Sequence, residues 1–215
     1  MSTHALPKET VRVWDPLVRL SHWMVAAAFL LAYFLAEEAL QLHVWLGYLV
    51  GILVLIRIAW GFFGTRHARF TDFLPAPAVL KGYIQGLFRG DEPRFLGHNP
   101  LGGIMVVLLL AALALTTLTG IMLYGAEDHR GPLGSWYAQQ TVAPQPPAYA
   151  ATEAGERHES EHPGGEAEQL EIWHDLAADL TLFLVGLHVA GVLFTSRRHK
   201  ENLVRAMFSG RKRVP

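Results

Sequence analysis

The chain has 215 residues, of which 51% are hydrophobic and 17% are charged, with six Trp and no Cys. The lack of cysteine excludes disulfides, thiolate metal sites, iron–sulfur clusters and covalently attached c-type haem. The formal net charge is −1, but positive and negative residues are concentrated in different regions of the chain. The apolar runs are too long for a soluble domain. Any redox centre must therefore be bound by histidine, methionine or carboxylate side chains.

Four apolar stretches are long enough to cross a membrane as helices. A bilayer core requires about 20 apolar residues at a rise of about 1.5 Å each. The stretches cover residues 20–36, 43–63, 101–124 and 172–194. The first has no small-residue cleavage site at its end, so we expect a retained helix and not a signal peptide. Asn99 and Pro100 predict the N-cap and the first residue of the third helix.

The fold class predicted from these stretches is all-α, an integral membrane four-helix bundle that forms a single domain over residues 1–215. Lys and Arg accumulate in the N-terminal arm, in the connection 64–99 and in the C-terminal tail. The loop 37–42 has two acids and no Lys or Arg, and the loop 125–171 has nine acids against two arginines. Because basic residues accumulate on the cytoplasmic side, we expect both termini to be cytoplasmic.

Two connecting segments carry further patterns. Residues 77–90 place apolar side chains at helical spacing beside two basic residues, which predicts a short interfacial helix between the second and third spans. Residues 139–169 are rich in Pro, Gly, Ala and Glu, and we expect them to form a flexible loop on the outer side. His158 and His162 have a spacing that could bind metal on a helix, but Pro163 follows at once, which favours a solvated acidic loop.

Four histidines in the spans sort by depth into two levels. His22 is near the cytoplasmic start of the first span, and His43 is at the outer start of the second. The last span runs inward, with His174 near its outer end and His188 fourteen residues later, which is about 21 Å deeper and almost four whole turns on. Geometry therefore pairs His22 with His188 on the inner side, and His43 with His174 on the outer side.

Each pair suits a haem better than a bare metal ion. Haem iron takes axial imidazole ligands above and below its ring, whereas zinc requires four protein ligands, or three and a water. A single histidine in a membrane helix can merely hydrogen-bond a neighbouring helix. Polar groups at that depth are costly, however, and usually mark function. The sequence therefore predicts two b-type haems, each with two histidine ligands.

Other polar residues near these levels have more than one reading. Arg57 lies within the second span, about 9 Å from its inner end, and can snorkel or pair with a propionate of the inner haem. Asp175 and Asp179 can orient the histidine that precedes them or relay protons, although a polar helix start also explains Asp175. His98 lies at the cytoplasmic interface without a partner of matched depth, and is either structural or close to a quinone. Glycines that allow close approach of helices or of a porphyrin are Gly47, Gly51, Gly120, Gly186 and Gly191.

The chain resembles the bacterial cytochrome b561 family, which includes the b-type cytochrome subunits of membrane-bound nickel–iron hydrogenases. The matching stretches are VWDPLVRLSHW (13–23), HVWLGYLVGILVLIRIAWGFFGTR (43–66), GHNPLGG (97–103), TGIMLYG (119–125) and WHDLAADLTLFLVGLHVAG (173–191). The resemblance implies a four-helix bundle in the bacterial inner membrane with two haems b. It also implies that the four ligands are His22, His43, His174 and His188.

The function implied by the resemblance is respiratory electron transport between a donor and membrane quinone. The donor is a partner protein, such as a hydrogenase, another dehydrogenase or a soluble cytochrome, or it is a small molecule such as superoxide. In the second case the chain is an oxidoreductase in its own right. We expect membrane lipids and quinone as partners, and no nucleic acid.

Two other classes of protein compete with this prediction. A structural membrane anchor without haem would be colourless and would tolerate loss of all four histidines. An ion-coupled transporter would use His and Asp as a proton relay, but would favour broken helices and internal repeats, and the sequence shows neither.

Overall fold

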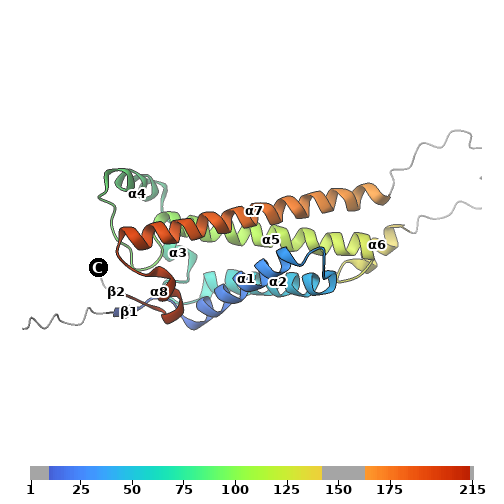
Figure 1. Cartoon of the computed structure of the whole chain (residues 1–215), viewed down its shortest axis with the longest axis horizontal. Helices are drawn as coiled ribbons and strands as arrows, with labels where there is room; N and C mark the ends of the chain where they lie inside the picture. Colours follow the sequence, from blue (N-terminus) through green and yellow to red (C-terminus); the bar gives the residue numbers. More distant parts are fainter. Residues whose placement is uncertain (1–9, 142–162, 214–215) are drawn as a thin grey trace, which may run out of the picture.

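The computed structural model describes residues 10–141 and 163–213. Within these ranges the chain forms eight α-helices and a two-stranded sheet (Figure 1). The elements are β1 (Thr10–Arg12), α1 (Pro16–Phe34), α2 (Leu40–Phe63), α3 (Phe70–Phe73), α4 (Pro77–Arg89), α5 (Pro100–Asp128), α6 (Gly134–Thr141), α7 (Pro163–Arg198), α8 (Leu203–Ser209) and β2 (Arg211–Arg213). His158 and His162, with most of the predicted flexible loop, lie outside the described residues.

The four long helices form the membrane bundle. In the described part of the chain, α1, α2, α5 and α7 are long and apolar enough to span a bilayer, which confirms the predicted fold class. The helix α7 packs along α5, α1 packs against α2, and α2 also meets α5 (Figure 1). Large apolar side chains such as Phe34 and Leu55 point outward, with 71% and 68% of their surface exposed, as expected for side chains that face lipid.

Local capping sets where the long helices begin. Asn99 accepts a hydrogen bond from Gly102 N at 2.7 Å, with proline in the first turn, as predicted for α5. Asp15 caps α1 in the same way, by accepting from Val18 N at 2.9 Å, so this helix begins four residues before the apolar stretch. Hydropathy alone does not detect such polar first turns.

Helices extend into both ends of the predicted loop at 139–169. The helix α6 runs to Thr141 and α7 begins at Pro163, nine residues before the predicted span. The fixed φ and missing N–H of Pro163 suit the first turn of a helix, so this proline begins α7. The outer end of α7 therefore extends beyond its apolar segment.

The described ends of the chain meet at one end of the bundle. β1 and β2 pair antiparallel, with Val11 opposite Lys212. We call this end, which also carries α4 and α8, the inner end, and the opposite end with α6 the outer end (Figure 1). The prediction of a helix at 77–90 is confirmed by α4, while its place on the membrane surface and the cytoplasmic location of the inner end stay predictions.

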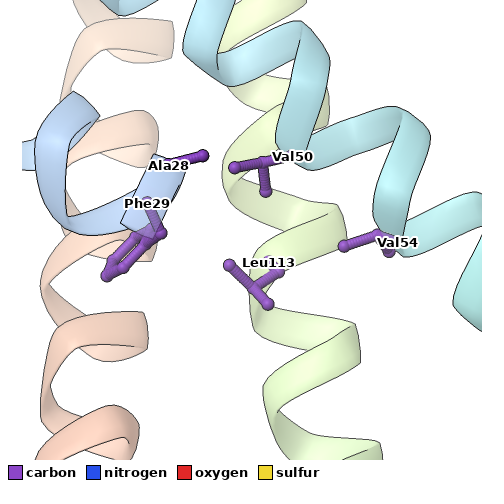
Figure 2. Close-up of a cluster of buried hydrophobic side chains, with 5 residues drawn as sticks. All are labelled: Ala28, Phe29, Val50, Val54 and Leu113. Carbon is purple, nitrogen blue, oxygen red and sulfur yellow. The ribbon is translucent and has the colours of Figure 1, made fainter. Parts of the chain in front are cut away.

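The core of the bundle is a small apolar cluster from three helices. Ala28 and Phe29 of α1, Val50 and Val54 of α2, and Leu113 of α5 point toward one another (Figure 2). The buried face of α2 continues toward the inner end with Arg57, which is 9% exposed. This face thus changes from apolar to cationic within one helical turn.

Candidate functional site

The inner pair of histidines bridges α1 and α7. The ring centroids of His22 and His188 are 6.2 Å apart, with the ring planes at 56°. Both side chains are half-buried. Nδ1 of His22 is buried and has no hydrogen-bond partner. The structure therefore brings together the two inner histidines that the depth argument paired.

The outer pair bridges α2 and α7 and is held more firmly. The ring centroids of His43 and His174 are 5.9 Å apart. Nδ1 of His43 lies 2.9 Å from the carbonyl oxygen of Ala32, in the last turn of α1, where helix carbonyls lack partners within the helix. Because a carbonyl only accepts, Nδ1 donates and the lone pair of Nε2 is left free for another partner.

His174 rests in a cradle on α5. Its Nδ1 lies 3.0 Å from the carbonyl oxygen of Thr116 and 3.2 Å from Oγ1 of Thr119. A Cβ on Gly120 would come within 2.8 Å of Cε1 of this ring, so the glycine is what permits the close approach. Donation from Nδ1 to Thr116 again leaves Nε2 free.

The threonines of this cradle were not predicted from the sequence. The residues predicted to orient His174 were Asp175 and Asp179. Asp179 accepts a hydrogen bond from the hydroxyl of Tyr33 at 2.7 Å, and His174 is oriented by α5. The missed signal was the stretch TTLTG (116–120), three threonines and a glycine in an otherwise apolar span. Polar residues within a membrane span usually have a function.

A pocket opens beside the outer pair. It contains about 640 Å³ of empty space, a volume that includes its open mouth. Both outer histidines line it, with apolar and tyrosine side chains around them. Gly47 also lines it, and a Cβ there would meet nothing within 4 Å. The pocket thus lies between the helices, next to both outer imidazoles.

The separations of the rings fit one metal atom between each pair. Two metal–nitrogen bonds of about 2 Å, with about 1 Å from each nitrogen to its ring centre, put the centroids roughly 6 Å apart. The observed separations are 6.2 and 5.9 Å. In the ranges that the structure describes, no group of three or more His, Cys, Asp or Glu side chains could hold a metal. Each pair therefore suits a metal whose other ligands come from a planar cofactor, as in haem.

Comparison with known proteins agrees with this chemistry. A family model described as prokaryotic cytochrome b561 matches residues 13–210, most of the chain. The chain belongs to the prokaryotic cytochrome b561 family. Membership implies a b-type cytochrome that binds haem b and transfers electrons in the membrane, and, with the four spans, a multi-pass protein of the bacterial inner membrane.

Curated relatives of this cytochrome have the name "Probable Ni/Fe-hydrogenase B-type cytochrome subunit". Those of Azotobacter vinelandii and Azotobacter chroococcum mcd 1 are each 24% identical to it, over 93% of this chain and 87% of their own length. That of Rhizobium leguminosarum bv. viciae is 25% identical, over 56% of this chain and 62% of its own length. No solved structure matches the chain significantly.

Arg57 of this cytochrome does not snorkel to the surface. It is 9% exposed, and its guanidinium carbon lies 5.8 and 5.9 Å from the ring centres of Phe70 and Phe73. Its Nη1 is buried without a hydrogen-bond partner. The other reading, a contact with a cofactor carboxylate, stays a proposal.

Proposed function

We propose that this chain is a di-haem b cytochrome that transfers electrons between a donor and membrane quinone. In this proposal His22 and His188 are the axial ligands of an inner haem, and His43 and His174 are those of an outer haem. The observation that carries it is the pairing of four histidines from three helices, with ring separations of 6.2 and 5.9 Å. Ordinary helix packing gives no reason for two such pairs at two depths.

The protein contributes ligand orientation and a dry environment. Haem b, when bound, supplies an iron that changes reversibly between two oxidation states. The hydrogen bonds from Nδ1 of His43 and His174 to backbone carbonyls fix both rings and increase the basicity of Nε2. The apolar walls of the outer pocket keep water away from the iron, which also affects its reduction potential.

We further propose that the donor is a protein subunit of the nickel–iron hydrogenase type. The support is that relatives with such names align with 93% of this chain. Quinone is the proposed acceptor because the family resemblance implies it. A small-molecule donor such as superoxide is the competing proposal. Assays of quinone reduction by the purified protein, with superoxide and with hydrogenase subunits in parallel, distinguish the two donors.

The ligand assignment is tested by haem content and redox titration of single variants. The wild-type protein is expected to contain two haems b per chain and to show a b-type reduced-minus-oxidised spectrum. His22→Ala and His188→Ala should remove the same redox component, and His43→Ala and His174→Ala the other. His129→Ala is the matched control. This histidine lies in the outer connection, where its Nδ1 is 3.4 Å from the carbonyl oxygen of Gly125, and it belongs to neither histidine pair.

Two results would contradict the proposal. A colourless wild-type protein that folds normally would favour the haem-free anchor. Loss of one component in both His22→Ala and His43→Ala would overturn the pairing, because those two side chains belong to different levels.

A further inference from the structure

The inner end of the bundle holds buried side-chain nitrogens that have no hydrogen-bond partner. Nη1 of Arg57 and Nδ1 of His98 are both buried without a hydrogen-bond partner. A buried donor without a partner costs about 1–3 kcal/mol, and more when the group is charged. The guanidinium can only donate and a neutral imidazole can donate from Nδ1, so both nitrogens suit an acceptor that the chain does not itself supply.

The two donors belong to one cluster. The ring of Phe73 on α3 lies 4.9 Å from the ring of His98 and 5.9 Å from the guanidinium carbon of Arg57. The centre of the Trp14 ring lies 4.6 Å from the centre of the His98 ring. Trp14 and Phe73 are themselves buried. Aromatic rings thus flank both the imidazole of His98 and the guanidinium of Arg57.

The charges around the cluster favour an anion. Burial, and then the positive charges of Arg57 and Lys212, lower the pKa of His98 to about 3, so its ring is neutral at physiological pH and carries one N–H. Asp15 is close enough to interact with Arg57, but its carboxylate already accepts from Trp60 Nε1 at 3.0 Å and from Thr65 Oγ1 at 2.5 Å. Arg57 therefore keeps an unpaired donor, and the neutral imidazole of His98 can offer its one N–H to the same acceptor.

The neighbour of this cluster is the inner histidine pair. His188 is among the groups whose charge acts on His98, and Arg57 lies on α2 toward the same inner end of the bundle. Haem b carries two propionate carboxylates on one edge of its ring. A guanidinium and a neutral imidazole N–H are suitable donors for such a carboxylate.

We propose that Arg57 and His98 form a carboxylate-binding site for a propionate of the inner haem. This inference rests on the proposed function, since it requires a haem at the inner level. It assigns a role to His98 and selects, for Arg57, one of the two roles that the sequence left open. Both residues act here as binding groups and neither is an iron ligand.

The test compares haem b with its dimethyl ester, in which the propionates are neutral. The purified full-length protein is loaded with either compound, and the loss of the inner haem to an excess of a haem-scavenging protein is timed. Arg57→Gln and His98→Leu should each accelerate the loss of haem b by about tenfold, as expected for one hydrogen bond to a charged group. They should leave the loss of the dimethyl ester unchanged.

Conservative variants separate binding from folding. Arg57→Lys keeps the charge and His98→Asn keeps a donor near the position of Nδ1, so both should retain most of the wild-type behaviour. Arg89→Gln is the matched control. This arginine is exposed at the end of α4, and its substitution changes the charge by the same amount as Arg57→Gln. A redox titration provides a second readout, in which Arg57→Gln should lower the midpoint of the inner haem by about 59 mV for a tenfold change in the equilibrium.

Three outcomes would overturn the inference. The first is an equal acceleration for haem b and its dimethyl ester, which would mean that Arg57 and His98 only support the fold or bind a free anion. The second is no change for either compound, and the third is an effect on the outer haem alone. Each differs from failure of the proposed function, in which the wild-type protein would bind no inner haem.

Discussion

The outer histidines are oriented by main-chain carbonyls and by the lack of one side-chain carbon. The carbonyls of Ala32 and Thr116 accept from Nδ1 of His43 and His174 at 2.9 and 3.0 Å. Main-chain groups cannot be removed by substitution, so the glycines near these rings offer the sharpest tests. A Cβ on Gly120 would collide with His174, whereas one on Gly47 would enter open space in the same pocket.

Gly120→Ala should disturb the outer pair alone. The added carbon would lie 2.8 Å from Cε1 and 3.2 Å from Nδ1 of His174, and overpacking of this kind costs about 1–3 kcal/mol. We expect weaker binding of the outer haem or a shifted midpoint, with the inner component unchanged, as measured by redox titration. Gly82→Ala, where a Cβ would meet nothing within 4 Å, is the control. An unchanged outer component would mean that the cradle does not set the orientation of His174.

Gly47→Leu should exclude the outer haem without harming the fold. Its side chain would extend into the pocket that Gly47 lines, and no protein atom lies within 4 Å of the new Cβ. We expect about one haem fewer per chain and an unchanged helix content by circular dichroism. Gly82→Leu is the matched control, and a full haem content in Gly47→Leu would show that the pocket is not the outer site.

At the scale of elements, ion pairs attach the connection between α4 and α5 to the end of α7 and the tail. Glu92 accepts from Nε and Nη2 of Arg198 at 2.7 and 3.1 Å. Glu201, in the turn after α7, lies 3.2 Å from Arg94 and 3.7 Å from Nζ of Lys212. These contacts fix the segment that leads to His98, so the polar inner end is positioned by side chains from three separate parts of the sequence.

The pair of Glu92 and Arg198 should make stability depend on pH. The hydrogen bonds from Arg198 lower the pKa of Glu92 to about 2. A lowered folded-state pKa stabilises the fold above the unfolded-state pKa, and this contribution is lost as pH falls through the interval between them. The thermal unfolding midpoint of Glu92→Gln should therefore lie below that of the wild type at neutral pH.

The difference between the two midpoints should shrink as pH falls from about 4.5 toward about 2, because Glu92 then becomes neutral in the wild type too. Asp91→Asn is the control, since it changes a neighbouring charge outside the ion pairs of Arg198 with Glu92 and of Arg94 with Glu201. A difference that stays constant with pH would assign the effect to shape and not to charge.

At the scale of the whole molecule, polarity is reversed with respect to a soluble bundle. Side chains such as Phe63 are 83% exposed, while Arg57 and Thr181 are 9% and 0% exposed. Lipid accepts apolar side chains on the outside of the bundle, and the interior holds polar residues that interact or bind a ligand beside its apolar core. The pairing of β1 with β2 then brings both described chain ends to the inner end of the bundle, so we expect both on one side of the membrane.

Labelling of single cysteines should show that sidedness. The chain has no cysteine of its own, so Thr10→Cys, Ser209→Cys and Ser135→Cys each introduce one exposed thiol. Basic residues accumulate on the cytoplasmic side, so a membrane-impermeant maleimide should label Ser135→Cys in intact spheroplasts. It should label the other two only after permeabilisation, and the reverse pattern would invert the predicted topology.

The sequence by itself determined the four spans, their alternation and the two depths of histidine, because length, hydropathy and helical rise are local properties of the chain. It also predicted the start of α5 from Asn99 and Pro100, yet it missed the similar start of α1 at Asp15 and the outer extension of α7 from Pro163. Polar first turns are set by single capping groups and leave no trace in a hydropathy window.

Only the tertiary structure decided which groups support the histidines. The carbonyl that holds His43 comes from α1 and the cradle of His174 from α5, and His98 meets Arg57 through Phe73 of α3. These contacts join residues that are far apart in the chain, and their formation depends on how the helices pack. Periodicity along one helix gives the direction of a side chain, but it contains no information on the neighbour that the side chain meets.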